Sequence, residues 1–201
     1  MTTSKILLRG LLTPLFALCV SWFWTGVGAI TPAEAAIKEI ARLTAFTGEV
    51  LVRSRLKWAQ VKEVDHRLIT NDKVVTKRGR AEITFSDGSL LKLDLDSNLR
   101  ITEKKVEKGL VTTRLVVERQ VRVLLGKVWF DIKSVVDVET GFTAPTMVAA
   151  IRGTTGGLSV DTRGGCTWGL SSGNASTAGS CSSFVARLPS PDVTVLAAAL
   201  P

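Results

Sequence analysis

The sequence predicts an all-β domain, an antiparallel sandwich, roll or short solenoid-like fold, preceded by a signal peptide and followed by a weakly ordered Gly/Ser-rich tail. Apolar residues recur with period two through residues 41–160, and turn residues interrupt this alternation at short intervals. Lys and Arg number 26 and Asp and Glu 18, but only three of these charges fall in residues 1–35 and three in residues 162–201. The 201 residues therefore divide into segments 1–35, 36–161 and 162–201.

Residues 1–35 have the order of parts that is typical of a secretory signal peptide. Two basic residues precede an uncharged run over residues 10–33, and a small-x-small cleavage site follows directly. The run is long enough to span a bilayer, so the segment is either cleaved before Ala36 or retained as an N-terminal anchor. In both cases the basic end stays in the cytoplasm, and the remaining chain is periplasmic or otherwise extracytoplasmic.

The clearest strands of the middle segment form a hairpin. Residues 81–85 and 91–95 alternate between apolar and polar side chains, and a Ser-Asp-Gly-Ser turn over residues 86–89 joins them. Two more alternating runs, one on each side of Gly126, predict a second pair of strands. A helix over residues 116–125 is the main local alternative.

Several short motifs follow one another along the middle segment, from Gly48-Glu49-Val50 to the final Ala-Ala-Ile-Arg-Gly-Thr that ends at Thr154. Their order resembles the FecR domain family, the extracytoplasmic domain of bacterial ferric citrate regulators and of many stand-alone exported proteins. The resemblance implies a β domain without an active site that takes part in cell-surface signalling. The matching residues, which we expect to be structural, are Trp58, Asp72, Asp87, Gly88, Gly126, Pro145, Arg152, Gly153 and Thr154.

Two departures limit what the resemblance implies. The regulators carry a sizeable cytoplasmic region, whereas here only nine residues precede the uncharged run, too few to fold into a sigma-binding unit. Family members usually continue with more strands beyond the position of Asp161. Residues 164–183 are instead rich in Gly and Ser, with few large apolar side chains, which indicates weak order.

The cysteines of the exported part offer a disulfide. Cys166 and Cys181 lie in the tail, and an oxidising compartment permits a bridge between them. Their separation in the sequence leaves open whether they are bridged.

The composition offers little for catalysis. The chain has one His, three Cys and no Tyr, so few side chains are available for proton transfer or metal binding. A Gly-x-Ser-x-Gly pattern over residues 169–173 has the letters of a nucleophile elbow, but no histidine follows it. We therefore expect a protein that is not an enzyme, with no catalytic residues, no cofactor and no metal.

A basic stripe is the candidate binding feature. Arg53, Arg55 and Lys57 occupy alternate positions, which predicts that they project from one face of a strand and bind anions. Outside the cytoplasm the available polyanions are lipid head groups, lipopolysaccharide phosphates and acidic cell-wall polymers, so we expect no nucleic acid partner.

These features predict an exported, non-enzymatic protein-binding or signalling module of the bacterial cell envelope. Its loops and any exposed edge strand would contact an envelope protein. The alternative is an envelope glycan or polyanion binder that uses the basic strand face. A membrane partner is expected only if the N-terminal segment is retained, and the sequence leaves the oligomeric state open.

Overall fold

The computed structural model describes residues 38–109 and 112–183, and its regular structure there is entirely β, as predicted. Residues 116–125 form a strand and not a helix, and no described helix is long and apolar enough to cross a membrane. The predicted export segment lies outside the described residues. The strands are β1 (Glu39–Thr47), β2 (Val50–Ser54), β3 (Lys57–Gln60), β4 (His66–Ile69), β5 (Lys73–Thr76), β6 (Arg80–Phe85), β7 (Leu90–Leu93), β8 (Asn98–Lys108), β9 (Arg114–Ile132), β10 (Val138–Ala144), β11 (Met147–Val160), β12 (Cys166–Gly179) and β13 (Ser182–Ser183).

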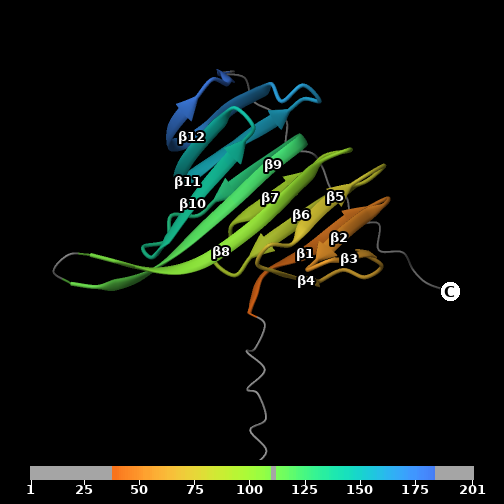
Figure 1. The fold of residues 1–201 in the computed structure, drawn as a ribbon, viewed down its shortest axis with the longest axis horizontal. Coiled ribbons are helices and arrows are strands. Elements are labelled where there is room, and N and C mark those ends of the chain that lie inside the picture. Colours follow the sequence, from red (N-terminus) through yellow and green to blue (C-terminus); the bar gives the residue numbers. More distant parts are fainter. Residues whose placement is uncertain (1–37, 110–111, 184–201) are drawn as a thin grey trace, which may run out of the picture. The chain divides into compact units, whose positions relative to one another are not determined.

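All the strands belong to one curled sheet that forms a half-barrel (Figure 1). Two series of strands meet at β9: one runs β4-β1-β6-β7 and the other β3-β2-β5-β8. From β9 the sheet continues through β10 and β11 to β12 and β13. The pairing is antiparallel except between β9 and β10 and between β12 and β13. The curl turns both series towards a common core.

The core takes alternate residues from both series. The hairpin predicted from residues 81–95 is confirmed as β6 and β7, with Ile83 opposite Leu91 and both side chains fully buried. Val74 of β5 and Leu99 of β8 contribute from the other series. Each such side chain stabilises the fold by about 1.5–3 kcal/mol relative to its exposed state, and the polar residues between them face outwards.

β9 is one continuous strand, whereas the alternating runs on each side of Gly126 predict two separate strands. Its inward-facing residues are Val121 and Val123 before this glycine, and Val128 and Phe130 after it. The change from odd to even positions accompanies a register shift in the β8–β9 pairing. A local irregularity of this kind lets a strand bend without losing its buried face.

Gly126 is required at this bend because of its conformation and its contact with Ser97. Its φ is +90°, and a Cβ at this position would lie 2.4 Å from Ser97 Oγ and 2.5 Å from Ser97 Cα. Ser97 is itself fixed, since its hydroxyl accepts a hydrogen bond from the Lys127 backbone N–H at 3.0 Å. Any side chain at position 126 would therefore displace the start of β8.

The expected weak order of residues 162–201 is wrong for the part that forms β12. β12 pairs with β11 over most of its length, and Trp168 stacks on Phe130 with ring centroids 5.3 Å apart and lies 6.4 Å from Phe142. One large aromatic anchor and backbone hydrogen bonds thus hold a strand whose composition is typical of a loop. Residues 184–201 lie outside the described part of the chain.

We predict that Gly126→Ala destabilises the fold by roughly 3 kcal/mol or more, because it adds a steric clash to an unfavourable φ. Gly88→Ala is the matched control, since Gly88 also has a positive φ (+79°) but no neighbouring atom within 4 Å of an added Cβ. Backbone strain alone at Gly88 is expected to cost about 1 kcal/mol. Urea unfolding of both variants measures the difference, and equal losses would contradict the steric role of Ser97.

Candidate functional site

Asp72 is a structural residue. It is fully buried, and its carboxylate accepts hydrogen bonds from the Ser54 hydroxyl at 2.7 Å and from the Ile69 backbone N–H at 2.8 Å. These bonds tie the turn between β4 and β5 to the end of β2. Because both carboxylate oxygens are engaged inside the protein, Asp72 is not available to a ligand.

Arg119 of β9 forms a buried ion network inside the curled sheet. Its Nη1 lies 2.8 Å from Asp87 Oδ2 and its Nη2 lies 3.3 Å from Glu103 Oε2. Its guanidinium also lies over the Phe85 ring, 3.8 Å from the centroid. The exposed fractions of the Arg119, Asp87 and Glu103 side chains are 2%, 8% and 7%. The network joins the β6–β7 turn of one strand series to β8 of the other.

Asp87 remains ionised in this network. Burial raises the pKa of its carboxyl group, but the hydrogen bond from the Ser89 backbone N–H and the interactions with Arg119 outweigh burial. The pKa of Asp87 therefore lies below its ordinary value of 3.8. A carboxyl whose pKa is lowered on folding stabilises the folded state above its ordinary pKa, and this contribution is lost as the pH falls through the lowered value.

The network reaches the surface at Lys38. Its Nζ lies 3.2 Å from Glu103 Oε1, the oxygen that Arg119 leaves free. Glu103 is also fixed through its backbone, since its N–H donates to the Thr70 hydroxyl and its carbonyl accepts from the same group, both at 3.0 Å. Arg119 and Lys38 therefore hold the carboxylate of Glu103, and Thr70 holds its backbone.

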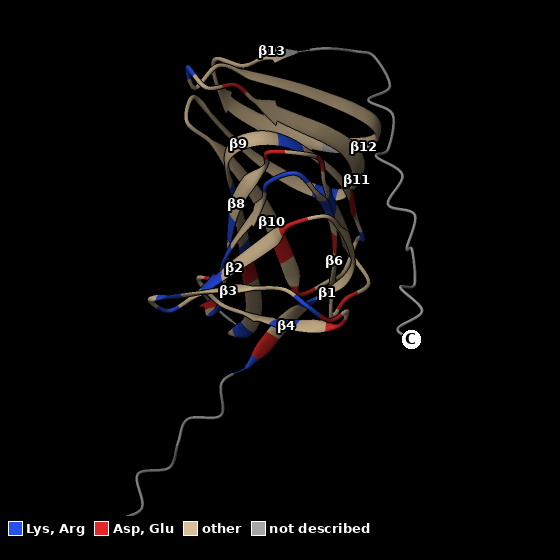
Figure 2. Ribbon diagram, turned by 90° about the vertical axis from the view of Figure 1, so that its right-hand side faces the viewer, with Lys and Arg blue, Asp and Glu red and all other residues tan. Residues whose placement is uncertain are grey.

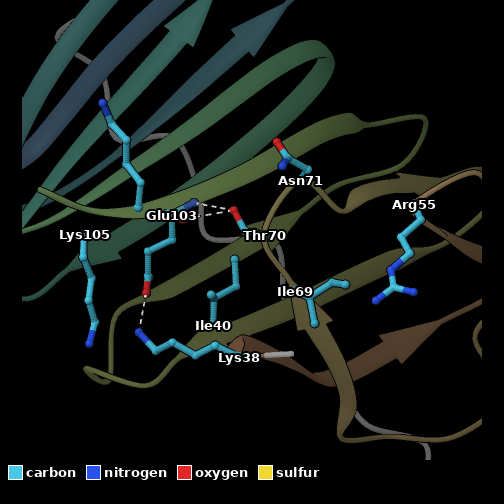
Figure 3. A pocket seen from close by; sticks show the side chains of 9 residues that line it. Lys38, Ile40, Arg55, Ile69, Thr70, Asn71, Glu103 and Lys105 are labelled. Carbon is cyan, nitrogen blue, oxygen red and sulfur yellow. Dashed lines mark hydrogen bonds and ion pairs between the residues drawn. The ribbon is translucent and has the colours of Figure 1, made fainter. Parts of the chain in front are cut away.

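A pocket of about 500 Å³ lies where these groups meet the surface, and Figure 3 shows its lining. We call it the basal pocket. Apolar side chains of β1 and β4 contribute to its wall, and basic side chains come from the β2–β3 turn, from β8 and from the residue before β1. Its lining residues are Lys38, Ile40, Arg55, Ile69, Thr70, Asn71, Glu103, Lys104 and Lys105.

The three residues of the predicted basic stripe do not share one strand face. Arg53 lies in β2, Arg55 lies in a turn with φ +56°, and Lys57 lies in β3. The register places Arg53 opposite Trp58 and Ser54 opposite Lys57. Residues directly opposite share a face and successive residues alternate, so Arg53 and Lys57 point to opposite sides. The prediction of a single stripe is wrong because the chain reverses at this point.

The same turn forms an exposed tip that combines apolar and basic side chains. Leu56 is 83% exposed, and Trp58 is 48% exposed. Arg53 and Lys73 each lie 5.8 Å from the Trp58 ring centroid, so this aromatic ring packs against cations on the outside of the sheet. We call residues 55–58 the hairpin tip.

The Arg-Gly-Thr motif lies in β11. Arg152 is exposed, and its Nε donates to the Ser134 hydroxyl at 3.3 Å. Gly153 has φ +56° at a register shift in the β11–β12 pairing, a conformation that favours glycine. The Thr154 hydroxyl donates to the Arg152 carbonyl at 3.0 Å. Pro145 lies in the tight turn between β10 and β11.

A disulfide joins Cys166 and Cys181. It connects the start of β12 to the residue before β13, and the Cα atoms are 5.0 Å apart. The Thr146 hydroxyl lies 3.2 Å from Cys166 Sγ. The bridge, together with Trp168, fixes β12 at the end of the sheet.

The fold and these surfaces define a curled β domain whose accessible features include the basal pocket and the hairpin tip. The chain belongs to the FecR protein family, because the family model matches residues 72–176, more than half of its length. This membership associates the chain with signalling at the cell envelope. The match ends within β12, beyond the predicted domain boundary at residue 161. No curated protein and no solved structure matches the chain.

The sequence pattern does not identify Arg119, Glu103 and Lys38 as residues of a common cluster. Arg119 and Glu103 are charged residues in alternating strands, where the pattern alone predicts a solvated face. The sequence does carry one signal for the burial of Arg119. It is two residues before Val121 and four before Val123, which are buried, so the alternation of a strand places all three on the same face. Nothing in the sequence identifies its partners, which are 16 and 32 residues away.

We predict that Arg119→Met lowers the free energy of unfolding at pH 7 by about 3–5 kcal/mol, because it leaves the buried Asp87 carboxylate without a cation and Glu103 with Lys38 alone. The loss should shrink as the pH falls below 3.8 and through the lowered pKa of Asp87. Protonation of Asp87 then removes its unpaired charge in the variant and its stabilising contribution in the wild type. Urea unfolding of the wild type and the variant, at pH 7 and below pH 3.8, measures how the loss changes with pH. Arg122→Met, on the same strand but exposed, is the control and should change little. A loss that does not depend on pH would contradict the electrostatic role.

Proposed function

We propose that this protein is an exported, non-enzymatic FecR-domain module of the bacterial cell envelope, which recognises an extended segment of a partner protein at the edge of β12. The observation that carries the proposal is the pairing of β12. Its 14 residues pair with β11 on one side, whereas β13 covers only Thr167 and Trp168 on the other. Among the described residues, the rest of that edge has no strand partner.

An edge strand of this kind can accept a further strand. Its outward N–H and C=O groups form hydrogen bonds with an extended peptide, as in the strand addition used by several peptide-binding domains. Proteins usually protect a long edge with lysine, proline or a bulge. Residues 166–179 contain no charged residue and no proline, and the two register shifts in their pairing with β11 lie on either side of Ser172. Figure 2 shows β12 without charged residues.

The edge is held rigidly, which lowers the entropy that is lost when a partner binds. The Cys166–Cys181 disulfide and the stacking of Trp168 on Phe130 fix one end of β12. The pairing with β11 extends from Cys166 to Gly179. An incoming segment would therefore meet a preformed template.

The absence of enzymatic activity in this proposal is supported by composition and by the family. The chain has one histidine and no tyrosine, and the FecR resemblance implies a β domain without an active site. The alternative function, polyanion binding by a basic strand face, requires Arg53, Arg55 and Lys57 to share one face, and they do not. Arg53 and Lys57 lie on opposite faces of the β2–β3 hairpin.

We predict that a photo-crosslinking amino acid at Ser176 captures one envelope protein in cells, through a single extended segment of that protein. Ser176 is exposed on β12. Mass spectrometry of the crosslinked peptide identifies the segment. Adding Ser172→Lys and Ala178→Lys should abolish the crosslink, because charged side chains block strand addition.

The matched control for this experiment is a different exposed edge strand, β3, which within the described chain pairs only with β2. A crosslinker at Gln60 should capture nothing comparable, and Gln60→Lys should leave the Ser176 crosslink intact. Equal capture from both edges, or capture that survives the two lysines in β12, would contradict the proposal.

We also predict that cell fractionation and intact-mass measurement find a periplasmic product that begins at Ala36. The small-x-small site before this residue is the expected cleavage point. A full-length product in the membrane fraction would instead show that the N-terminal segment is retained as an anchor. Recovery of native protein from the cytosol alone would overturn the proposed export.

A further inference from the structure

The basal pocket and the hairpin tip are parts of one surface. Arg55 belongs to both, since it lines the pocket and forms the β2–β3 turn. We call the combined region the basal surface. The polypeptide enters the domain here, because Lys38 is a lining residue and precedes β1 directly.

The carboxylate of the basal pocket is already engaged. Glu103 is 7% exposed, and its two oxygens lie within 3.3 Å of Arg119 and Lys38. A ligand that enters the pocket therefore meets Glu103 with its charge compensated. The remaining charged lining residues are all basic.

Two of these basic residues are available to a ligand. Lys104 Nζ is not one of them, because it lies 2.8 Å from Glu118, whose pKa is lowered to about 2 by Lys104 and Lys108. Arg55 and Lys105 form no ion pair with any residue of the described ranges, and both are exposed. They lie on different sides of Ile40 and Ile69, as Figure 3 shows. The pocket therefore combines free cations with apolar side chains.

The hairpin tip adds an apolar group that protrudes. Leu56 is 83% exposed between Arg55 and Lys57, and Trp58 follows it. A single exposed leucine is common and needs no explanation. A leucine flanked by two cations and followed by a half-exposed tryptophan is the combination found where proteins insert into the head-group region of a bilayer.

We propose that the basal surface binds an anionic phospholipid leaflet. Arg55, Lys105 and Lys57 contact the lipid phosphates, and Lys38 adds to the positive potential. Leu56 enters the boundary between head groups and acyl chains, and Trp58 lies at head-group depth. This inference goes beyond the proposed function, since it depends on export but not on a partner at β12.

A bilayer fits this surface better than a free phosphate or an acidic peptide does. A phosphate ion would occupy the cations of the pocket but leave Leu56 and Trp58 in water. An acidic peptide in the pocket would pair with the cations, but it would also leave the protruding Leu56 and Trp58 in water. A leaflet presents phosphates and an apolar boundary together, so it satisfies both parts of the surface.

The test is co-sedimentation of the exported protein with vesicles of equal parts phosphatidylglycerol and phosphatidylcholine, compared with pure phosphatidylcholine. We expect a preference for the anionic vesicles that weakens as salt is added. Each basic residue near an anionic surface contributes about five-fold in affinity, so Arg55→Asn with Lys105→Gln should weaken binding about 25-fold. Asparagine is chosen because it tolerates the positive φ of Arg55. Leu56→Ser should also weaken binding while leaving the net charge unchanged.

The matched control is Arg78→Gln with Arg163→Gln, which removes the same charge from two exposed arginines outside the basal surface. This variant should bind almost as the wild type does, and circular dichroism checks that all variants fold. Equal loss in the two double variants would overturn the proposal, because it would indicate attraction by net charge alone. No preference for anionic vesicles would overturn it as well. So would tight binding of soluble oligoglutamate at Arg55 and Lys105 without vesicle binding, which would identify an acidic peptide site.

Discussion

The whole domain depends on one strand that must pair with different partners along its length. β9 pairs with β8 over its first part and with β7 and β11 over its last part. Each strand series ends at its own edge strand, and among the described strands only β9 connects the two series within the sheet. The core is enclosed because β9 bends at Gly126 and changes the parity of its inward-facing residues there. The close contact between Gly126 and Ser97 is thus the constraint that positions β8, and β8 in turn supplies Glu103, Lys104 and Lys105 to the basal pocket.

The buried Arg119 is best understood as a link between the two series and not as a source of stability. Desolvation of a charge is costly, and an apolar replacement of a whole buried ion cluster is often neutral or stabilising. Asp87 and Glu103, however, come from different strand series. An arginine that binds both therefore fixes the distance between the two series. The second oxygen of Glu103 then orients Lys38 at the surface. The internal network and the charge balance of the basal pocket therefore have a common origin.

The sequence was a good guide where local pattern and tertiary structure agree. The β6–β7 hairpin could be predicted because its alternation and its Ser-Asp-Gly-Ser turn are both local signals. The β2–β3 turn could not, since Arg55 adopts a left-handed conformation without the glycine or asparagine that usually marks one. Without that signal, the alternation of Arg53, Arg55 and Lys57 predicted a single strand face, although these residues belong to a hairpin. β12 was missed for the opposite reason, because strand pairing with β11 overrides a loop-like composition. Arg119 shows a third limit, since its partners are brought together only by the curl.

The two proposed contacts involve opposite kinds of surface at separate parts of the domain. The basal surface is built from the start of β1, the β2–β3 turn, the end of β4 and the middle of β8, whereas the free edge belongs to β12. Figures 1 and 2 both place β12 at the far side of the domain from the start of β1. A domain whose basal surface faces a leaflet would therefore hold the uncharged edge of β12 away from the lipid. Charge at one end and its absence at the other would allow lipid and a partner strand to bind the same molecule without competing.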